Sequence, residues 1–543
     1  MRDLRAVGAV ALWGLLAAPG AARGQAAGPR YLPAAVAPGT PPSGPVRIGD
    51  GLVSGSLASG GVRAVRGIPY AAPPVGALRW REPQPAAPWR GVRDVTRFGP
   101  RCMQLPVFGD MVFRSSGMSE DCLYLNVWAP PRAAAPRLPV LVYFYGGGFI
   151  AGDGSENRYD GASLARRGIV VVTVNYRLGA FGFLAHPELT RESPHHASGD
   201  YGLLDMVAAL HWVRRNIAAF GGDPAHVTIA GESAGSIAVC ALMASPLSRG
   251  LIAGAFGESG GMIHPTFAPV PLVDGERRGQ AFADSLGAPS LAALRALPAE
   301  TLLAATARPG SDRFAATVDG WFLPATPAEI FAAGSQAHVP LLVGWNSEES
   351  DWRGLLGTGE PTPANYAAAV RGRFGARADE ALRLFPGASP EQVQASGTLL
   401  AGAMFIGYST WKWAVLQERT GHSRVYRYLY VRPRPAPKVP APGPPPPGAV
   451  HSAEIEYALG NLATNQVYAW TPDDSAVSET MESYFASFVK TGAPDAAGLP
   501  RWPAAAGDSA RVMILDVHPH AEPAPHEGAY RFLDAFYTAA PAP

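Results

Sequence analysis

Short apolar runs alternate along this chain with helical patterns. The runs are rich in β-branched and aromatic residues and are bounded by Gly or Pro, which is typical of buried strands. They cover residues 140–145, 169–174, 227–230, 340–344 and 425–431. Between them the clearest helical spacing runs from 201 to 219, and a further helical stretch at 365–420 predicts an insertion over the sheet. Strands that alternate with helices predict a mainly parallel sheet covered on both faces.

The composition is consistent with one large packed core that carries long loops. Apolar residues make up 47% of the 543 residues and charged residues only 16%, which is below the average of about 25% and argues against disorder. The 62 Gly and 54 Pro predict many turns. Residues 433–447 hold nine prolines, so we expect an extended surface loop there.

The charge balance argues against a nucleic-acid partner. Forty-five basic and 44 acidic side chains leave a net charge of +1. A chain with this balance has no overall positive field to hold nucleic acid or an anionic membrane.

The N-terminus has the order of a secretory signal peptide. Two arginines precede an apolar run at residues 6–18, and small residues follow at 22–26. We expect a signal peptide over 1–24, cleaved between 22 and 27, and a flexible mature N-terminus over 25–45. The apolar run is 13 residues long, short of the roughly 20 that span a membrane. The prediction is a secreted or periplasmic protein without a membrane span in its mature form; the alternative is an uncleaved N-terminal anchor.

Export would place the three cysteines in an oxidising compartment, where one bridge and one free thiol are expected. Cys102 and Cys122 enclose nineteen residues and could staple a surface loop, which the loop-entropy model values at roughly 3 kcal/mol. Cys240 lies in an apolar stretch and is predicted to be buried in the core. A nucleophilic role for Cys240 is disfavoured because no charged residue stands beside it to lower its pKa.

The pattern Gly-x-Ser-x-Gly occurs twice, and only one copy has the context of a nucleophile elbow. Residues 231–235 follow a predicted strand and precede a helix-compatible stretch at 236–244, so Ser233 is the predicted nucleophile. The second copy, around Ser259, is followed by Met-Ile-His-Pro, which cannot open a helix cleanly. We therefore interpret Ser259 as a loop residue or as one that lies behind the site.

Three consecutive glycines at 146–148 follow the predicted strand at 140–145. Glycines let the backbone approach a substrate closely, and backbone N–H groups are good donors to an oxyanion. We predict an oxyanion hole made by the amides of Gly147, Gly148 and Ala234. The alternative is a dinucleotide fingerprint that ends at Ala151, but that motif must open a helix and Gly-Asp-Gly-Ser-Glu-Asn follows here instead.

These motifs resemble the type-B carboxylesterases, the α/β-hydrolase family that includes cholinesterases and bacterial p-nitrobenzyl esterases. The matching blocks follow the family order: residues 119–128, 145–149, 175–178, 201–205, 220–224 and 231–235. The resemblance implies an α/β-hydrolase fold. It consists of a large, mainly parallel central sheet with helices on both faces and long loop and helical insertions, in a single domain over 46–540.

The resemblance also implies the partners of the serine, in the order serine, acid, histidine. The acid of the family aligns with Glu349, where Ser350 replaces the usual Gly, and Glu348 is the alternative. The family histidine aligns with His451, followed by Ser452 where the family has Gly.

The predicted function is a secreted serine carboxylesterase that hydrolyses small-molecule esters through an acyl-enzyme and requires no metal or organic cofactor. The alternative is a catalytically inactive binding or adhesion module on the same fold, which the intact set of reactive residues disfavours.

Phe149 and Glu232 are possible substrate-site residues. The alternative for Phe149 is core packing, and the alternative for Glu232 is support of the elbow. The adjacent His195 and His196 lack a matched set of metal ligands. The loop between Cys102 and Cys122 holds no Trp that could stack on a quaternary ammonium group, which argues against choline esters as substrates. The sequence makes no prediction of the oligomeric state.

Overall fold

The structure is a computed structural model that describes residues 44–131, 137–308, 314–439, 446–505, 507 and 511–539. The predicted signal peptide at 1–24 lies outside the described residues. So do all but the last two residues of the predicted mature N-terminus at 25–45, and residues 440–445 of the Pro-rich loop.

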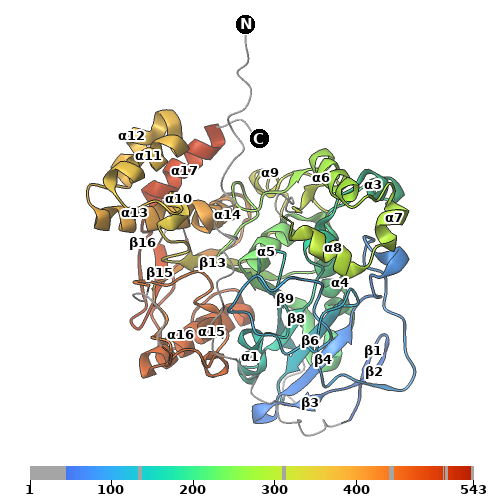
Figure 1. Ribbon diagram of the computed structural model, residues 1–543. Helices are drawn as coiled ribbons and strands as arrows, with labels where there is room; N and C mark the ends of the chain where they lie inside the picture. The colour runs from blue at the N-terminus through green and yellow to red at the C-terminus, as the bar shows by residue number, and fades with distance from the viewer. Residues whose placement is uncertain are drawn as a thin grey trace.

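An eleven-stranded sheet forms the centre of the molecule (Figure 1). Its strand order is β16-β15-β14-β13-β10-β9-β7-β8-β6-β4-β3. The bounds are β3 (Ser56–Leu57), β4 (Arg63–Pro69), β6 (Tyr124–Ala129), β7 (Leu138–Phe144), β8 (Val170–Val174), β9 (Gly222–Glu232), β10 (Gly254–Glu258), β13 (Leu341–Asn346), β14 (Val425–Tyr430), β15 (Arg511–Leu515) and β16 (His520–Pro523). Two small sheets join β1 (Val46–Ile48), β2 (Gly51–Ser54) and β5 (Val92–Asp94), and β11 (Val270–Pro271) and β12 (Thr317–Val318).

The prediction of a mainly parallel sheet is confirmed for its centre. Every neighbouring pair from β15 to β8 runs parallel. The five predicted strands correspond to β7, β8, β9, β13 and β14, all of which lie in this part. The two edges are antiparallel, where β16 pairs with β15 and where β3, β4 and β6 follow β8.

The described helices are α1 (Ala162–Arg166), α2 (Gly179–Phe183), α3 (Pro187–Glu192), α4 (Tyr201–Asn216), α5 (Ala234–Ala244), α6 (Leu272–Ser285), α7 (Leu291–Ala296), α8 (Ala299–Thr306), α9 (Pro327–Ala332), α10 (Arg353–Leu356), α11 (Pro363–Phe374), α12 (Ala378–Leu384), α13 (Pro390–Gly402), α14 (Tyr408–Thr420), α15 (Ile455–Ala458), α16 (Pro472–Thr491) and α17 (Glu527–Ala539). The predicted helical stretch at 201–219 forms α4 and a following 3₁₀ turn. None of these helices is long and apolar enough to cross a membrane.

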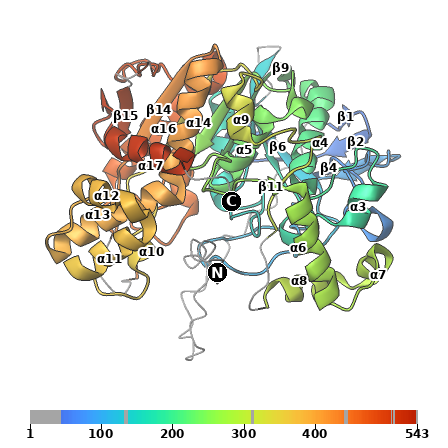
Figure 2. The same cartoon turned by 90° about the horizontal axis from the view of Figure 1, so that it is seen from above.

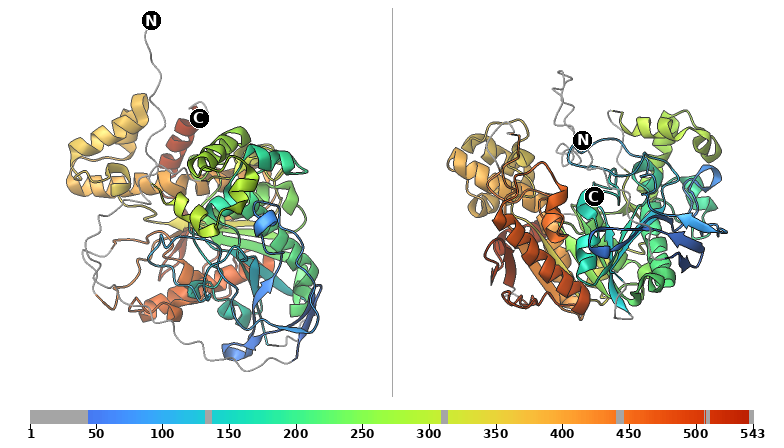
Figure 3. Two further views of the ribbon diagram at one scale, coloured as in Figure 1. Left: turned by 45° about the vertical axis from the view of Figure 1, so that its right-hand side comes forward. Right: turned by 90° about the horizontal axis from the view of Figure 1, so that it is seen from below.

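Helices cover both faces of the sheet (Figures 2 and 3). Consecutive residues of a strand point to opposite faces, and two residues of β10 show what each face contacts. The ring of Phe256 lies 4.3 Å from Phe485 of α16, whereas a Cβ at the adjacent Gly257 would lie 2.5 Å from the indole of Trp413 in α14. The helices α14 and α16 therefore lie on opposite faces.

The helical insertion predicted at 365–420 comprises α11 to α14 and packs beside α17 (Figure 1). It forms a second hydrophobic cluster, which includes Tyr366, Leu400, Trp411 and Tyr530. Between α13 and α14 the chain makes a π-helical turn, η7 (Ala403–Gly407).

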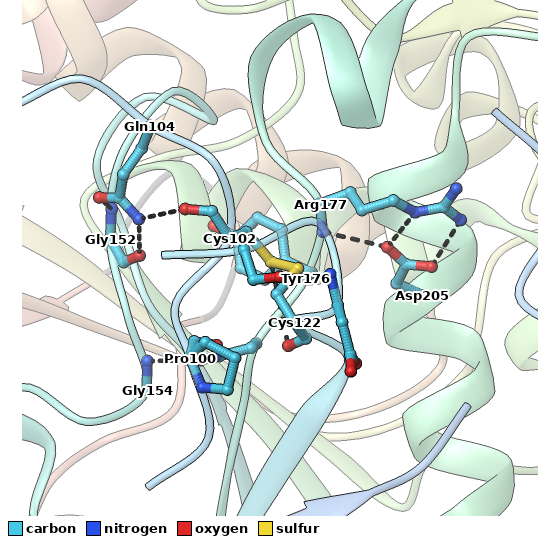
Figure 4. The surroundings of a disulfide bond; sticks show 12 residues. Pro100, Cys102, Gln104, Cys122, Gly152, Gly154, Tyr176, Arg177 and Asp205 are labelled. Carbon is cyan, nitrogen blue, oxygen red and sulfur yellow. Dashed lines mark hydrogen bonds and ion pairs between the residues drawn. A yellow bond between two sulfur atoms is a disulfide. The ribbon is translucent and has the colours of Figure 1, made fainter. Parts of the chain in front are cut away.

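The predicted bridge between Cys102 and Cys122 is formed (Figure 4). Next to it, the amide of Gln104 donates to the carbonyl of Gly152 at 2.8 Å and accepts from its N–H at 2.9 Å, which ties the disulfide loop to the segment after the three glycines. Cys240 is fully buried, and burial raises the pKa of its thiol to about 12, in agreement with the predicted core role.

Candidate active site

Ser233 lies on a sharp turn between β9 and α5. Its φ is +54°, a left-handed conformation that side chains adopt rarely and at some cost. The flanking position 235 must be glycine for a steric reason, because a Cβ there would overlap the carbonyl oxygen of Phe144 in β7. The strand, turn and helix predicted around Ser233 are therefore present, and the turn needs glycine to pass so close to the neighbouring strand.

The three residues expected to react together meet in one chain of contacts. The Nε2 atom of His451 lies 2.9 Å from the Oγ of Ser233, and its Nδ1 atom lies 2.5 Å from the Oε2 of Glu349. The serine and the histidine are 218 positions apart in the sequence. The fold brings them together because β9 and β13 end at the same edge of the parallel sheet, and the segment with His451 bridges to the loop after β13.

Glu349, and not its neighbour Glu348, contacts the histidine. The second oxygen of Glu349 accepts hydrogen bonds from the backbone N–H of Asn346 at 2.7 Å and from the hydroxyl of Ser259 at 2.5 Å. The backbone N–H of Glu348 donates to the carbonyl of Ala449 at 2.8 Å. Of the two carboxylates weighed from the sequence, the geometry favours Glu349.

Ser259, in the second Gly-x-Ser-x-Gly copy, lies behind the acid. It is fully buried and has a φ of +57°. Its hydroxyl points to Glu349, so the structure agrees with an interpretation of Ser259 as a residue behind the site.

The glycine segment passes directly beside the elbow. A Cβ at Gly146 would lie 3.1 Å from the Cβ of Ser233, and Gly147 and Gly148 have φ values of +101° and +62°. Ala234 is the first residue of α5, so its amide belongs to the N-terminal end of a helix. All three amides predicted for the oxyanion hole therefore belong to segments that adjoin the Ser233 side chain.

A second carboxylate faces the histidine. The Oε1 atom of Glu232 lies 3.4 Å from Nε2 of His451, and Glu232 is only 2% exposed. Burial raises the pKa of Glu232 to about 8, against the opposing effect of His451. Burial lowers the pKa of His451, but Glu232, Glu349 and Glu454 outweigh it and raise that pKa to about 10. The protonation of His451 thus depends on Glu232 as well as on Glu349.

Two apolar side chains that were not predicted to belong to the site lie beside His451 and Gly147. The ring of Phe405 in η7 lies 5.2 Å from the imidazole of His451 and nearly perpendicular to it. The methyl group of Met111, in the disulfide loop, lies 2.8 Å from where a Cβ at Gly147 would stand. The sequence of η7 carries no pattern that marks a π-helical turn, and the contact of Met111 depends on how its loop folds back.

Phe149, a possible substrate-site residue, is 5% exposed and packs among aromatic rings, with Phe183 at 5.0 Å and Phe267 at 5.9 Å. These contacts favour the alternative in which Phe149 packs in the core.

Within the described part of the chain, no group of three or more His, Cys, Asp or Glu could hold a metal ion. The ring of His195 stacks on Trp321 at 3.8 Å.

A large mixed sheet with helices on both faces and a serine on a tight strand–helix turn define an α/β-hydrolase. The model of the carboxylesterase family matches residues 43–370 and 383–533. Similar proteins include the fumonisin B1 esterase of Sphingopyxis macrogoltabida, which is 37% identical over 84% of this chain and 83% of the relative. The para-nitrobenzyl esterase of Bacillus subtilis is 34% identical over 86% of this chain and 93% of the relative, and the cocaine esterase of Homo sapiens is 32% identical over 83% and 84%.

The chain belongs to the carboxylesterase family and is a hydrolase of carboxylic ester bonds. The resemblance seen in the sequence is thereby confirmed.

Proposed function

We propose that this protein is a secreted serine carboxylesterase that works through an acyl-enzyme, with Ser233 as nucleophile, His451 as general base and Glu349 as the acid that orients it. The observation that carries the proposal is the contact chain of 2.9 Å from serine to histidine and 2.5 Å from histidine to glutamate. Side chains within this reach can transfer the serine proton as the hydroxyl attacks.

In the first half of the reaction, Ser233 attacks the carbonyl carbon of the ester while Nε2 of His451 takes its proton. Glu349 accepts a hydrogen bond from Nδ1–H and stabilises the imidazolium that forms. The negative charge on the ester oxygen is held by the amides of Gly147, Gly148 and Ala234. His451 then gives its proton to the departing alcohol.

In the second half, water attacks the acyl-enzyme and His451 again acts as the base. The acid product leaves and Ser233 regains its proton. Each proposed proton transfer passes through Nε2 of His451, which exchanges the proton with Ser233, the departing alcohol or water.

The proposed substrate is a small ester whose apolar parts contact Met111 and Phe405. Both side chains lie beside proposed catalytic groups, which supports an apolar substrate site. The similar proteins are named for quite different esters, so a panel that varies the acyl and the alcohol part separately, measured as kcat/KM, is the appropriate test.

The test of the nucleophile uses Ser233→Ala, with Ser259→Ala as the matched control from the second copy of the motif. Loss of the nucleophile should lower turnover of p-nitrophenyl butyrate by roughly 10⁶-fold. It should also abolish covalent labelling by a fluorophosphonate, whereas Ser259→Ala should still be labelled. Labelling of Ser233→Ala at the wild-type rate would refute the assignment, and a wild-type protein that is not labelled at all would favour the inactive binding module.

Secretion is proposed from the N-terminal pattern, and the disulfide between Cys102 and Cys122 supports it because such bridges persist in oxidising compartments. N-terminal sequencing of exported protein should find a mature start near residues 22–27. An unprocessed N-terminus would contradict the predicted cleavage.

A further inference from the structure

A cavity lies behind Glu349, between the sheet and the helical insertion. Counted together with the open solvent at its mouth, the space inside it is about 550 Å³. Its walls come from β13 and β14 and from α13, α14 and α17, which lie together at one end of the sheet (Figure 1). The lining includes Glu349 but neither Ser233 nor His451, so this space is separate from the reacting serine.

The cavity is lined by a buried cation with unused hydrogen-bond donors. The side chain of Arg427, in β14, is only 2% exposed. Its Nε and Nη1 atoms have no hydrogen-bond partner among the described residues. The Oε2 atom of Glu527 lies 3.7 Å from Nη1, beyond hydrogen-bond distance. A buried guanidinium that lacks acceptors is costly, so the site favours any ligand that supplies them.

The two carboxylates in the lining are already engaged elsewhere. Both oxygens of Glu349 take part in the contacts with His451, Asn346 and Ser259. Glu527 accepts a hydrogen bond from Trp411 at 3.0 Å and pairs with Arg531 of its own helix at 3.4 Å. Neither is free to move onto the guanidinium without giving up these partners.

The chemistry of the walls indicates the kind of ligand. The parallel N–H pairs of a guanidinium are Nε with Nη2 and Nη1 with Nη2, so a carboxylate on Arg427 would accept from Nη2 together with one of the two unused donors. The remaining lining is largely apolar and includes Trp345, Leu399, Leu429 and Tyr530. We propose that this cavity binds a small monocarboxylate, with its carboxylate on Arg427 and a short apolar tail against these side chains. The acid released by ester hydrolysis has this chemistry.

The test measures binding of butyrate by isothermal titration calorimetry to the full chain carrying Ser233→Ala. Butyrate should bind saturably at one site, more tightly than acetate because of its tail, and chloride or inorganic phosphate should not replace it. Replacing Arg427 by Gln should weaken binding at least about tenfold, the loss expected for a charge-assisted hydrogen bond. Arg371→Gln, which removes an exposed arginine on α11, is the matched control and should bind as before.

A second variant keeps the proposal open to refutation if Arg427→Gln does not fold. Glu527→Gln removes a negative charge 3.7 Å from Nη1 of Arg427, which repels an incoming carboxylate, and should therefore tighten butyrate binding. Binding that is unchanged in Arg427→Gln, weaker in Glu527→Gln, or equal for butyrate, acetate and phosphate would overturn the proposal, as would the absence of saturable binding. Because the protein used lacks the proposed nucleophile, the result does not depend on the proposed catalytic mechanism.

Discussion

The carboxylate of Glu232 should set the acidic limit of turnover, and Glu232→Gln tests this directly. Oε1 of Glu232 lies 3.4 Å from Nε2 of His451, the nitrogen proposed to accept the proton of the serine. A negative charge there stabilises the imidazolium and raises the pKa of His451. Gln keeps the size of the side chain and removes the charge, so the neutral, reactive imidazole should persist to lower pH.

The expected shift follows from this distance. Two unit charges 3.4 Å apart interact by about 1 kcal/mol in water and by about 5 kcal/mol at an effective dielectric constant of 20. At 1.36 kcal/mol per pKa unit, this corresponds to a lowering of about 1 to 3.5 units. Glu232 and His451 titrate as a pair, because burial raises the pKa of Glu232 to about 8 while the carboxylates raise that of His451 to about 10. We therefore expect the acidic limb of the pH profile of kcat/KM to move to lower pH by at least about one unit in Glu232→Gln.

The assay is kcat/KM for p-nitrophenyl butyrate across roughly pH 5 to 10, which reports the ionisation of the free enzyme. The matched control is Glu258→Gln. Glu258 precedes Ser259 as Glu232 precedes Ser233, and it is fully buried, but its contact is a hydrogen bond from Tyr143 at 3.0 Å. Burial raises the pKa of Glu258 well above its usual value, which favours its neutral form, and its hydrogen bond is with Tyr143 and not with His451, so its replacement should leave the acidic limb of the pH profile in place. If the acidic limb of the pH profile of Glu232→Gln stays in place or moves to higher pH, or if the control shifts equally, the charge of Glu232 does not set the acidic limit.

Three further predictions concern the acid and the disulfide. Ser259→Ala removes the 2.5 Å hydrogen bond to Glu349 and should lower kcat about 10- to 100-fold with little change in KM; an unchanged kcat would mean that Ser259 does not position the acid. Glu349→Gln should lower kcat by about 10⁴-fold, while Glu348→Gln should change it by no more than a few-fold; equal losses would contradict the choice between them. Replacing Cys102 and Cys122 by Ser should lower the free energy of unfolding by roughly 3 kcal/mol in urea titrations, and identical midpoints would show that the bridge contributes nothing.

The parallel centre of the sheet could be predicted because its strands are buried on both faces and read as continuous apolar runs. The strand β6 escaped prediction partly because Asn126 interrupts its apolar sequence. In the structure Asn126 is satisfied by partners far along the chain, since its amide donates to Thr173 at 3.0 Å and accepts from the N–H of Gly67 at 2.9 Å. A polar residue in a buried strand is explained only when its neighbours in space are known.

The same limit applies to the site. Ser233 could be predicted to lie on a strand–turn–helix elbow because that signal is local, with a strand and a helix on either side of one short motif. The contacts of Ser259, Phe405 and Arg427 depend on chain segments that are distant in sequence, and no spacing in the sequence connects them. Arg427 in particular lies within a run that predicts a buried strand, and its unused donors become visible only with the cavity beside it.

The two Gly-x-Ser-x-Gly copies show how the surroundings give one motif two roles. Both serines follow parallel strands in register, where Glu232 pairs with Glu258, and both have a positive φ. Their N–H groups even make the same bond, from Ser233 to the carbonyl of Glu258 and from Ser259 to that of Gly344, each at 2.8 Å.

What differs is the next element and the next strand. After Ser233 the helix α5 begins at once, so its hydroxyl stands at a helix N-terminus and close to His451. After Ser259 two glycines follow without a helix, and the strand β10 lies one position nearer to β13, from whose end Glu349 projects. Ser259 therefore contacts Glu349, the proposed acid, and Ser233 contacts His451, the proposed base. Because strand order in the sheet decides this, moving the motif by one strand changes its partner from the histidine proposed to take the proton to the glutamate proposed to orient that histidine.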